Sequence, residues 1–151
     1  MGIPSLTALT VSFALGGTAL SGECPADKMR ANATQPVTTP AKDVSDTVLA
    51  SIDLAKEPAK IHDRELRLRK LVIQPGGIVP WHSHGDRPAI IYIVDGEVTE
   101  YASNCAVPIL HKTGEVARET HLTSHWWKNT GNSTAVLLSA DVLHDKTDKN
   151  M

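Results

Sequence analysis

The stretch PWHSHGDRPAIIYIVDGE (residues 80–97) combines two histidines one residue apart with a nearly continuous apolar segment. Successive side chains on a β-strand alternate between its two faces, so residues i and i+2 point the same way. On a strand, His82 and His84 therefore direct both imidazoles into one space. The apolar segment 89–96 predicts a further strand, and its closing Asp-Gly pair predicts a hairpin with EVTEY (97–101).

Most of the remaining chain also has strand patterns. The segment ELRLRKLVI (65–73) alternates leucine with arginine, which predicts a strand with one buried and one wet face. PGG at 75–77 predicts a turn. Further strands are predicted at 47–54, in VPILHKTGE (107–115), which ends in a turn at Gly114, and in a last pair, 125–132 with 134–145, joined by Thr-Gly-Asn. Strands that recur about every 8 to 12 residues without a helix pattern are typical of an all-β antiparallel sandwich or barrel.

The length of 151 residues suits one domain preceded by two short segments. Residues 1–21 are uncharged and rich in small and apolar residues, which predicts a signal peptide and a periplasmic or secreted protein; the alternative is a membrane anchor. Residues 22–45 are rich in Pro, Thr and Ala and predict an extended arm or linker, and 46–151 form the predicted barrel. In an oxidising compartment Cys24 and Cys105 are able to pair; the alternative is two free thiols.

Charge excludes one class of partner. The chain has 15 basic and 17 acidic residues, a formal charge of −2, and no basic block. We therefore expect no nucleic acid partner. The three tryptophans all lie beside histidines, at 81, 126 and 127.

A third histidine completes a candidate metal site. His125 lies on a later predicted strand, where Trp127 and Asn129 share its face by parity. Three imidazoles that converge inside a barrel suit a borderline divalent metal.

Two motifs resemble those of the cupin superfamily. GGIVPWHSHGDRPAIIYIVDG (76–96) resembles the first cupin motif, in which a Gly is followed by His-x-His, a Glu and a closing Gly. GEVARETHLTSHWWKN (114–129) resembles the second, with His125 as its histidine. The resemblance covers roughly 65–145 and implies a single-domain double-stranded β-helix, also called a jelly-roll barrel, and a homodimer. It is poor evidence for one activity, because this fold has many.

The sequence departs from the first motif where the family has its Glu, because that position is Ala89. The resemblance then implies a metal held by His82, His84 and His125 alone. Such a set favours Fe, Cu, Zn or Ni and leaves an open position; the alternative is a decayed site. Candidates to replace the Glu are Asp86, Glu97, Glu100 and Glu119, each of which otherwise fits a solvated turn or surface. His62, His111 and His144 carry no pattern and are expected at the surface, whereas His121 shares the face of His125 if that strand is unbroken.

Four residues are predicted to bind substrate: Arg87, Tyr92, Trp127 and Asn129. Arg87 otherwise fits the surface, Trp127 core packing, and Asn129 either orients a ligand or caps the turn at 130–131. Trp126 is expected to face outward, onto a dimer partner or the arm. The functional hypothesis is an exported small cupin that binds a divalent transition metal and acts on a small molecule as an oxygenase, isomerase or lyase. The alternatives are a non-catalytic periplasmic metal- or ligand-binding module, and a structural domain without metal.

Overall fold

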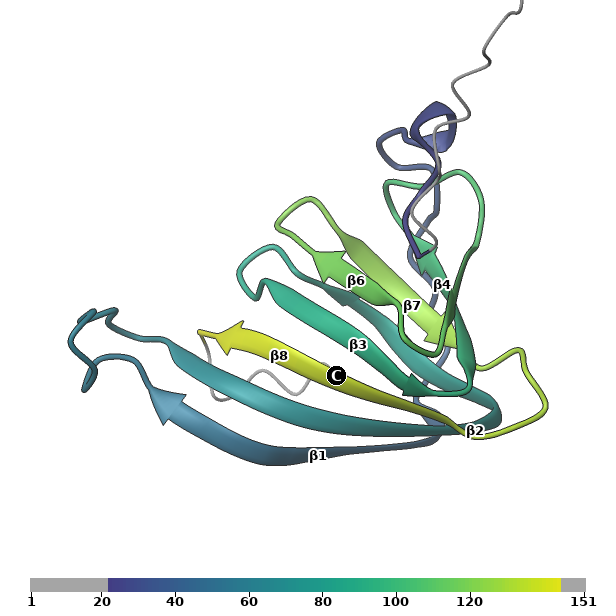
Figure 1. The fold of residues 1–151 in the computed structure, drawn as a ribbon. Helices are drawn as coiled ribbons and strands as arrows, with labels where there is room; N and C mark the ends of the chain where they lie inside the picture. Colours follow the sequence, from purple (N-terminus) through teal and green to yellow (C-terminus); the bar gives the residue numbers. More distant parts are fainter. Residues whose placement is uncertain (1–21, 145–151) are drawn as a thin grey trace, which may run out of the picture.

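The computed structural model describes residues 22–144 and is almost entirely β (Figure 1). A short 3-10 turn, η1, is followed by eight strands. Their bounds are η1 Ala26–Lys28, β1 Lys42–Asp53, β2 Glu65–Ser83, β3 Ala89–Asp95, β4 Glu97–Ala102, β5 Ile109–Lys112, β6 Val116–Glu119, β7 Ser124–Lys128 and β8 Ala135–Leu143. Within the described residues no helix is long and apolar enough to cross a membrane. The predicted signal segment 1–21 lies outside these residues.

The strands form an antiparallel barrel in the order β5-β4-β7-β2-β8-β3-β6, with β1 paired to β2. Strand β2 belongs to both halves of the barrel because its first part pairs with β8 and its last part with β7. The predicted all-β jelly-roll barrel is confirmed.

The predicted turn at 75–77 is wrong, because β2 continues through it. Gly76 has a φ of +77°, which bends the strand without ending it. A side chain at Gly77 would lie 2.7 Å from the carbonyl oxygen of Asp43, so the neighbouring backbone requires glycine there. The bend carries β2 from one half of the barrel to the other.

The two predicted hairpins are also wrong in their partners. Strand β3 pairs with β6 and β8, whereas β4 pairs with β5 and β7. Gly96 joins them with a φ of +75°, and a side chain there would lie 2.6 Å from the carbonyl oxygen of Thr134. Strands β7 and β8 likewise pair with different neighbours. The Asp-Gly and Thr-Gly-Asn signals locate reversals of the chain, but in a jelly roll a reversal often leads into the other half of the barrel.

The inner face of β2, β8 and β3 changes from apolar to polar along the barrel. The register places Ile73 opposite Ala135, then Leu71 opposite Leu137, then Arg69 opposite Ser139, then Arg67 opposite Asp141. The core lies at the apolar end and also contains Val79, Ile91, Ile93, Val98, Ala117 and Trp127. The polar end therefore lies next to the histidine motif.

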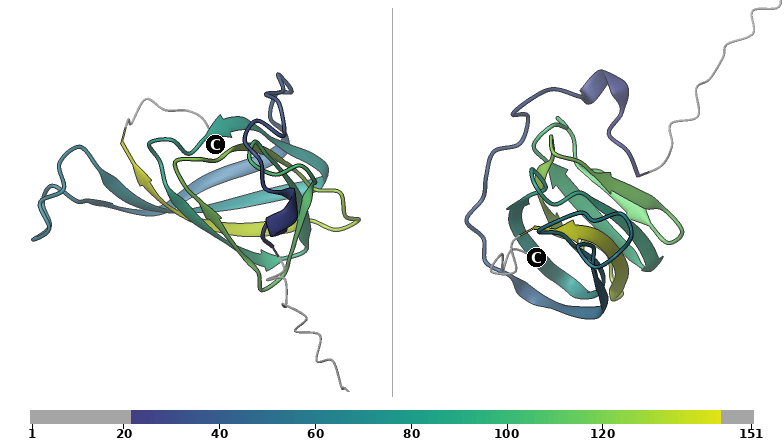
Figure 2. Two further views of the ribbon diagram at one scale, coloured as in Figure 1. Left: turned by 90° about the horizontal axis from the view of Figure 1, so that it is seen from above. Right: turned by 90° about the vertical axis from the view of Figure 1, so that its left-hand side faces the viewer.

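The N-terminal arm crosses the outside of the barrel before it enters the sheet (Figure 2). A disulfide joins Cys24 to Cys105, and Met29 forms a bridge with the same segment. Cross-linking two cysteines 81 residues apart stabilises the fold by about 4–5 kcal/mol in the chain-entropy account. Strand β1 begins at Lys42, inside the segment expected to be arm.

Candidate metal centre

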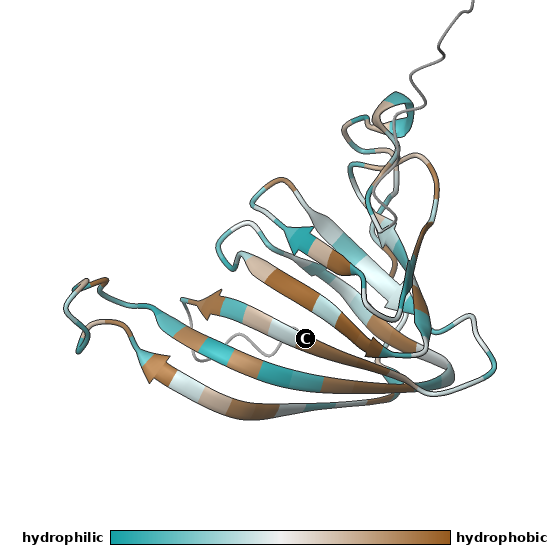
Figure 3. Cartoon of the chain, viewed as in Figure 1, coloured by the Kyte–Doolittle hydropathy of each residue, from teal (hydrophilic) through white to brown (hydrophobic). Residues whose placement is uncertain are grey.

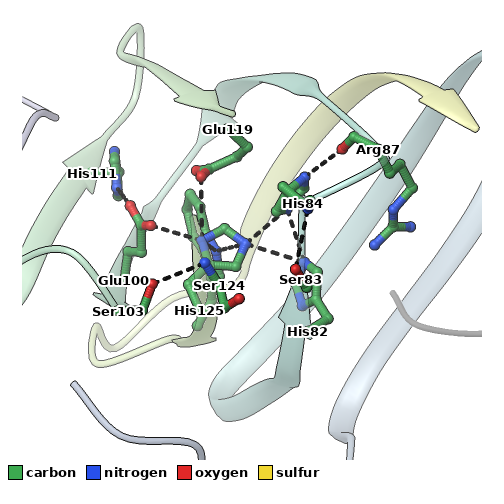
Figure 4. Close-up of polar contacts among 12 residues, drawn as sticks. His82, Ser83, His84, Arg87, Glu100, Ser103, His111, Glu119, Ser124 and His125 are labelled. Atoms are coloured by element: carbon green, nitrogen blue, oxygen red, sulfur yellow. Dashed lines mark hydrogen bonds and ion pairs between the residues drawn. The ribbon is translucent and has the colours of Figure 1, made fainter. Parts of the chain in front are cut away.

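Three buried histidines meet at the polar end of the barrel. His82 is near the end of β2, His84 follows it, and His125 lies on β7 directly opposite His82. Their exposed fractions are 6%, 1% and 0%. The three Nε2 atoms form a nearly equilateral triangle with sides of 3.1, 3.0 and 3.1 Å (Figure 4).

The other ring nitrogen of each histidine faces a hydrogen-bond acceptor. Nδ1 of His82 donates to the carbonyl of Pro80 at 2.9 Å, and Nδ1 of His84 donates to the carbonyl of Arg87 at 2.7 Å. Nδ1 of His125 donates to Oε1 of Glu100 at 2.7 Å. Carbonyl and carboxylate oxygens only accept, so each Nδ1 carries a proton, and each ring in its neutral form directs its Nε2 lone pair to the common centre.

The donor set fits a divalent transition metal. Two nitrogens that bind one metal at about 2.1 Å lie about 3.0 Å apart at a right angle and about 3.4 Å apart at the tetrahedral angle. The observed separations of 3.0 to 3.1 Å match the right angle. Three ligands at right angles occupy one face of an octahedron and leave the opposite face for exogenous ligands.

Burial keeps two of the rings neutral. It lowers the pKa of His82 to about 2 and that of His84 to about 3, and the neighbouring His125 adds to both shifts. Burial also lowers the pKa of His125, but the carboxylates of Glu119 and Glu100 outweigh it and raise that pKa above its usual value. Without a metal, His125 is able to carry a second proton on Nε2, which faces the Nε2 lone pairs of His82 and His84.

Glu100 on β4, one of the candidates to replace the Glu of the first motif, is buried rather than at the surface and anchors His125 through Nδ1. Its second oxygen accepts a hydrogen bond from Nε2 of His111 at 2.9 Å. Burial opposes the ionised form, but hydrogen bonds from His111 and His125 lower the pKa of Glu100 to about 2. The expected surface position of His111 is wrong: it is 0% exposed and stacks on Trp127. The sequence signal for this burial is the alternation in ILHK (109–112), which places His111 on the same face as the buried Ile109.

Glu119 on β6 lies directly opposite Ala89, the position where the family has its Glu. Its carboxylate is 3.5 Å from Nδ1 of His125, on the far side of that ring from the three Nε2 atoms (Figure 4). Burial raises the pKa of Glu119 to about 7, with nearby Glu100 adding to the shift and His125 opposing it. Glu119 therefore does not complete the triangle, although Glu100, Glu119 and His125 form a second buried group of potential ligands.

The remaining candidate acids and histidines lie away from the centre. Asp86 is exposed and pairs with Arg64 at 2.7 Å and with His144. Glu97 is half-buried, and both His62 and His121 are exposed.

A small cavity adjoins the triangle. Its volume is about 20 Å³, and His82, His84 and Trp127 form part of its wall. The other lining residues are Arg69, Leu71, Val79, Ile91, Leu137 and Ser139. Trp127 is therefore placed where the sequence predicted it. Its indole nitrogen lies 3.0 and 3.2 Å from the two ring nitrogens of His125, with the rings at 85°, so it contacts the imidazole face.

Tyr92 does not line this cavity. It alternates on β3 with the buried Ile91 and Ile93, so its side chain lies on the outer face and is 43% exposed. Trp126 faces outward as expected, but it stacks on Tyr101 of the same chain, with ring centroids 4.1 Å apart.

Two other predicted substrate residues have structural contacts. Arg87 is 3% exposed, and its guanidinium lies 3.6 Å from Asp141 while its carbonyl orients His84. The side chain of Asn129 donates to the carbonyls of Ile73 and Ser133, at 2.8 Å each, and accepts from the amide of Gly131. Asn129 thus caps the turn, the alternative that the sequence left open.

A second cavity of about 380 Å³ lies between the arm and the barrel. The arm contributes Gly22, Glu23, Cys24 and Met29 to its wall. Glu100 and Glu119 also line it, whereas none of the three histidines of the triangle does. This cavity is therefore on the Nδ1 side of His125.

Comparison with known proteins agrees with this architecture. A family model described as "Cupin domain" matches residues 69–141, which contain all three histidines. The chain belongs to the cupin superfamily. No curated protein matches significantly.

Solved structures support the cupin fold. A double-stranded β-helix protein from Klebsiella pneumoniae is 15% identical, with a TM-score of 0.53, over 75% of this chain and 85% of that chain. KdgF from Halomonas sp. is 12% identical with a TM-score of 0.52, over 76% and 96%. The cupin domain of Schizosaccharomyces pombe Cnp3 is 14% identical with a TM-score of 0.52, over 72% and 66%. At these identities the likeness concerns the fold alone.

Proposed function

We propose that this cupin holds one divalent transition metal through the Nε2 atoms of His82, His84 and His125. One observation carries the proposal: all three Nδ1 atoms donate to fixed acceptors while the three Nε2 atoms lie 3.0 to 3.1 Å apart. Metal-binding histidines commonly donate their other nitrogen to a carboxylate or carbonyl in this way. The arrangement needs no rotation of a side chain to receive a metal.

Three neutral imidazoles favour Fe, Cu, Zn or Ni over Mn and Mg, because no carboxylate belongs to the set. When bound, such a metal supplies a Lewis-acidic or redox centre with open coordination positions. The chain holds the ligands rigid through Pro80, Arg87 and Glu100 and excludes bulk water with apolar walls.

The proposed role is chemistry on a small molecule of the oxygenase, isomerase or lyase type. The carboxylates of Glu100 and Glu119 lie behind His125 and do not line the cavity beside the triangle, so the reaction is one that depends on the metal rather than on a carboxylate pair. The small volume of that cavity, about 20 Å³, favours a second candidate: a module that captures metal without turnover. Metal-dependent turnover distinguishes the two.

We also propose export to the periplasm or the outside of the cell. The uncharged segment 1–21 is the signal, and the disulfide between Cys24 and Cys105 suits an oxidising compartment.

A homodimer is proposed through the outer face of the sheet. Large apolar side chains of β2, β3 and β6 are exposed there: Leu66 38%, Leu68 37%, Ile90 58%, Tyr92 43% and Val116 43%. The register brings Leu68 and Ile90 to either side of Ala140, so these side chains form a continuous patch. Figure 3 shows the hydrophobic residues along these strands. A patch of this kind is commonly covered in a complex, and a second copy of the same face is a self-complementary cover.

Elemental analysis of the full-length protein, expressed with its N-terminal segment and purified without chelator, tests the metal proposal. We expect about one equivalent of a transition metal in the wild type and none in a His82→Ala/His84→Ala variant. A His62→Ala/His121→Ala variant is the matched control, since both residues are exposed. Absence of metal from the wild type, even after reloading, would contradict the proposal.

A further inference from the structure

One row of the barrel interior places an arginine and a serine beside the histidine triangle. Arg69 on β2 lies opposite Ser139 on β8, and Ser139 lies opposite Ile91 on β3. All three side chains line the 20 Å³ cavity together with His82 and His84. The cavity therefore has polar groups on the wall that faces two of the proposed metal ligands.

Two of these polar groups have no hydrogen-bond partner among the described residues. Arg69 is 5% exposed; its terminal nitrogens pair with Asp46 and, at 3.3 Å, with Asp141, but its Nε is unpaired. Ser139 is 2% exposed, and its Oγ is unpaired. Buried polar groups are nearly always hydrogen-bonded, so two unpaired groups on one cavity point to a ligand that pairs with them.

The local charge favours an anion. Three buried or half-buried arginines, 67, 69 and 87, gather around Asp46 and Asp141, so several positive charges lie close to the cavity. A divalent metal held by three neutral histidines adds its full charge, because no carboxylate belongs to the ligand set.

The volume of the cavity limits the size of that anion. One water needs about 10–15 Å³ on this measure, and pockets for organic ligands exceed about 300 Å³. A cavity of about 20 Å³ therefore holds only about one or two water-sized groups, which excludes all but the smallest anions.

We propose that this cavity binds a small monoanion, of the size of azide or formate, between the metal and the pair formed by Arg69 and Ser139. One end of the anion occupies an open coordination position, and the other accepts hydrogen bonds from Nε of Arg69 and Oγ of Ser139. This inference rests on the metal centre proposed above and names the class of its ligand.

Azide titration of the Cu(II)-loaded full-length protein tests the proposal, with the azide-to-copper charge-transfer band as the readout. We expect saturable binding that weakens about tenfold in Ser139→Ala and in Arg69→Lys, which keeps the charge but removes Nε from its position. Ser133→Ala, on an exposed turn, is the matched control. Because Oγ of Ser139 has no partner, Ser139→Ala is expected to fold and to bind copper as the wild type does.

Each outcome decides the question. Equal azide affinity in the wild type and Ser139→Ala, with copper bound in both, overturns the anion site and leaves the metal centre standing. Failure of the wild type to bind copper or any other transition metal overturns both proposals. Ser139→Ala carries the test, because it leaves the pairs of Arg69 with Asp46 and Asp141 intact.

Discussion

Replacing Glu100 by Gln tests whether the chain prearranges its metal ligands. The carboxylate accepts hydrogen bonds from two histidines, Nδ1 of His125 at 2.7 Å and Nε2 of His111 at 2.9 Å. The amide of Gln has one accepting oxygen, so one of the two N–H groups loses its acceptor. Each hydrogen bond to a charged group contributes about 1.5–3 kcal/mol, and loss of such an orienting partner typically weakens metal binding by about 10- to 100-fold.

The expected result is a rise of about 10- to 100-fold in the Kd for Zn²⁺, equivalent to about 1.4–2.7 kcal/mol. Competition with a chromophoric chelator at pH 7.5 measures it. Circular dichroism of the metal-free variant checks that the barrel still folds.

Glu119→Gln is the matched control for this experiment. Its carboxylate is equally buried but lies 3.5 Å from Nδ1 of His125, and its pKa is raised to about 7. Because a separation of 3.5 Å is too long for a hydrogen bond that orients the ring, we expect the Kd for Zn²⁺ to change by less than about threefold. If both variants weaken zinc binding equally, or if Glu100→Gln does not weaken it, then Glu100 does not orient His125.

Three further predictions concern protons, the disulfide and the outer face. Because His82 and His84 have pKa values of about 2 and about 3, only His125, whose pKa is raised, must lose its proton to bind metal. Between pH 5 and 6 the logarithm of the zinc association constant should therefore rise by about one per pH unit. Three histidines with unshifted pKa values would give a slope near three. Chelator competition at each pH measures this slope. Replacing both cysteines by serine should lower the free energy of unfolding by about 4–5 kcal/mol in urea titration, and an unchanged midpoint would contradict the role of the disulfide. Ile90→Lys, on the exposed patch, should convert a dimer into a monomer in sedimentation velocity; a monomeric wild type would contradict the dimer.

The sequence predicted the strands better than their partners. Alternating and apolar segments such as 65–73 and 89–95 became strands because side-chain burial on one or both faces is a local property of the chain. The turn signals at 75–77 and at Gly96 were misinterpreted, because a positive φ changes the direction of the chain without specifying which strand lies beside the next segment. Pairing depends on contacts between residues far apart in the chain.

The candidate site divides in the same way. His82, His84 and His125 were predictable, because strand periodicity aligns the first two and the second motif contains the third. The contacts of Glu100 and His111 were not, since both look like alternating strand residues until β4, β5 and β7 are placed side by side.

The class of fold and the three histidines of the candidate centre were predictable from the sequence, because both follow from spacing along one strand or within one motif. Three properties became evident from the folded chain alone: which nitrogen of each ring carries the proton, that Tyr92 faces solvent, and that Arg69 and Ser139 meet across β2 and β8. Those properties depend on which strands are neighbours and on which groups are buried between them, and a linear pattern specifies neither.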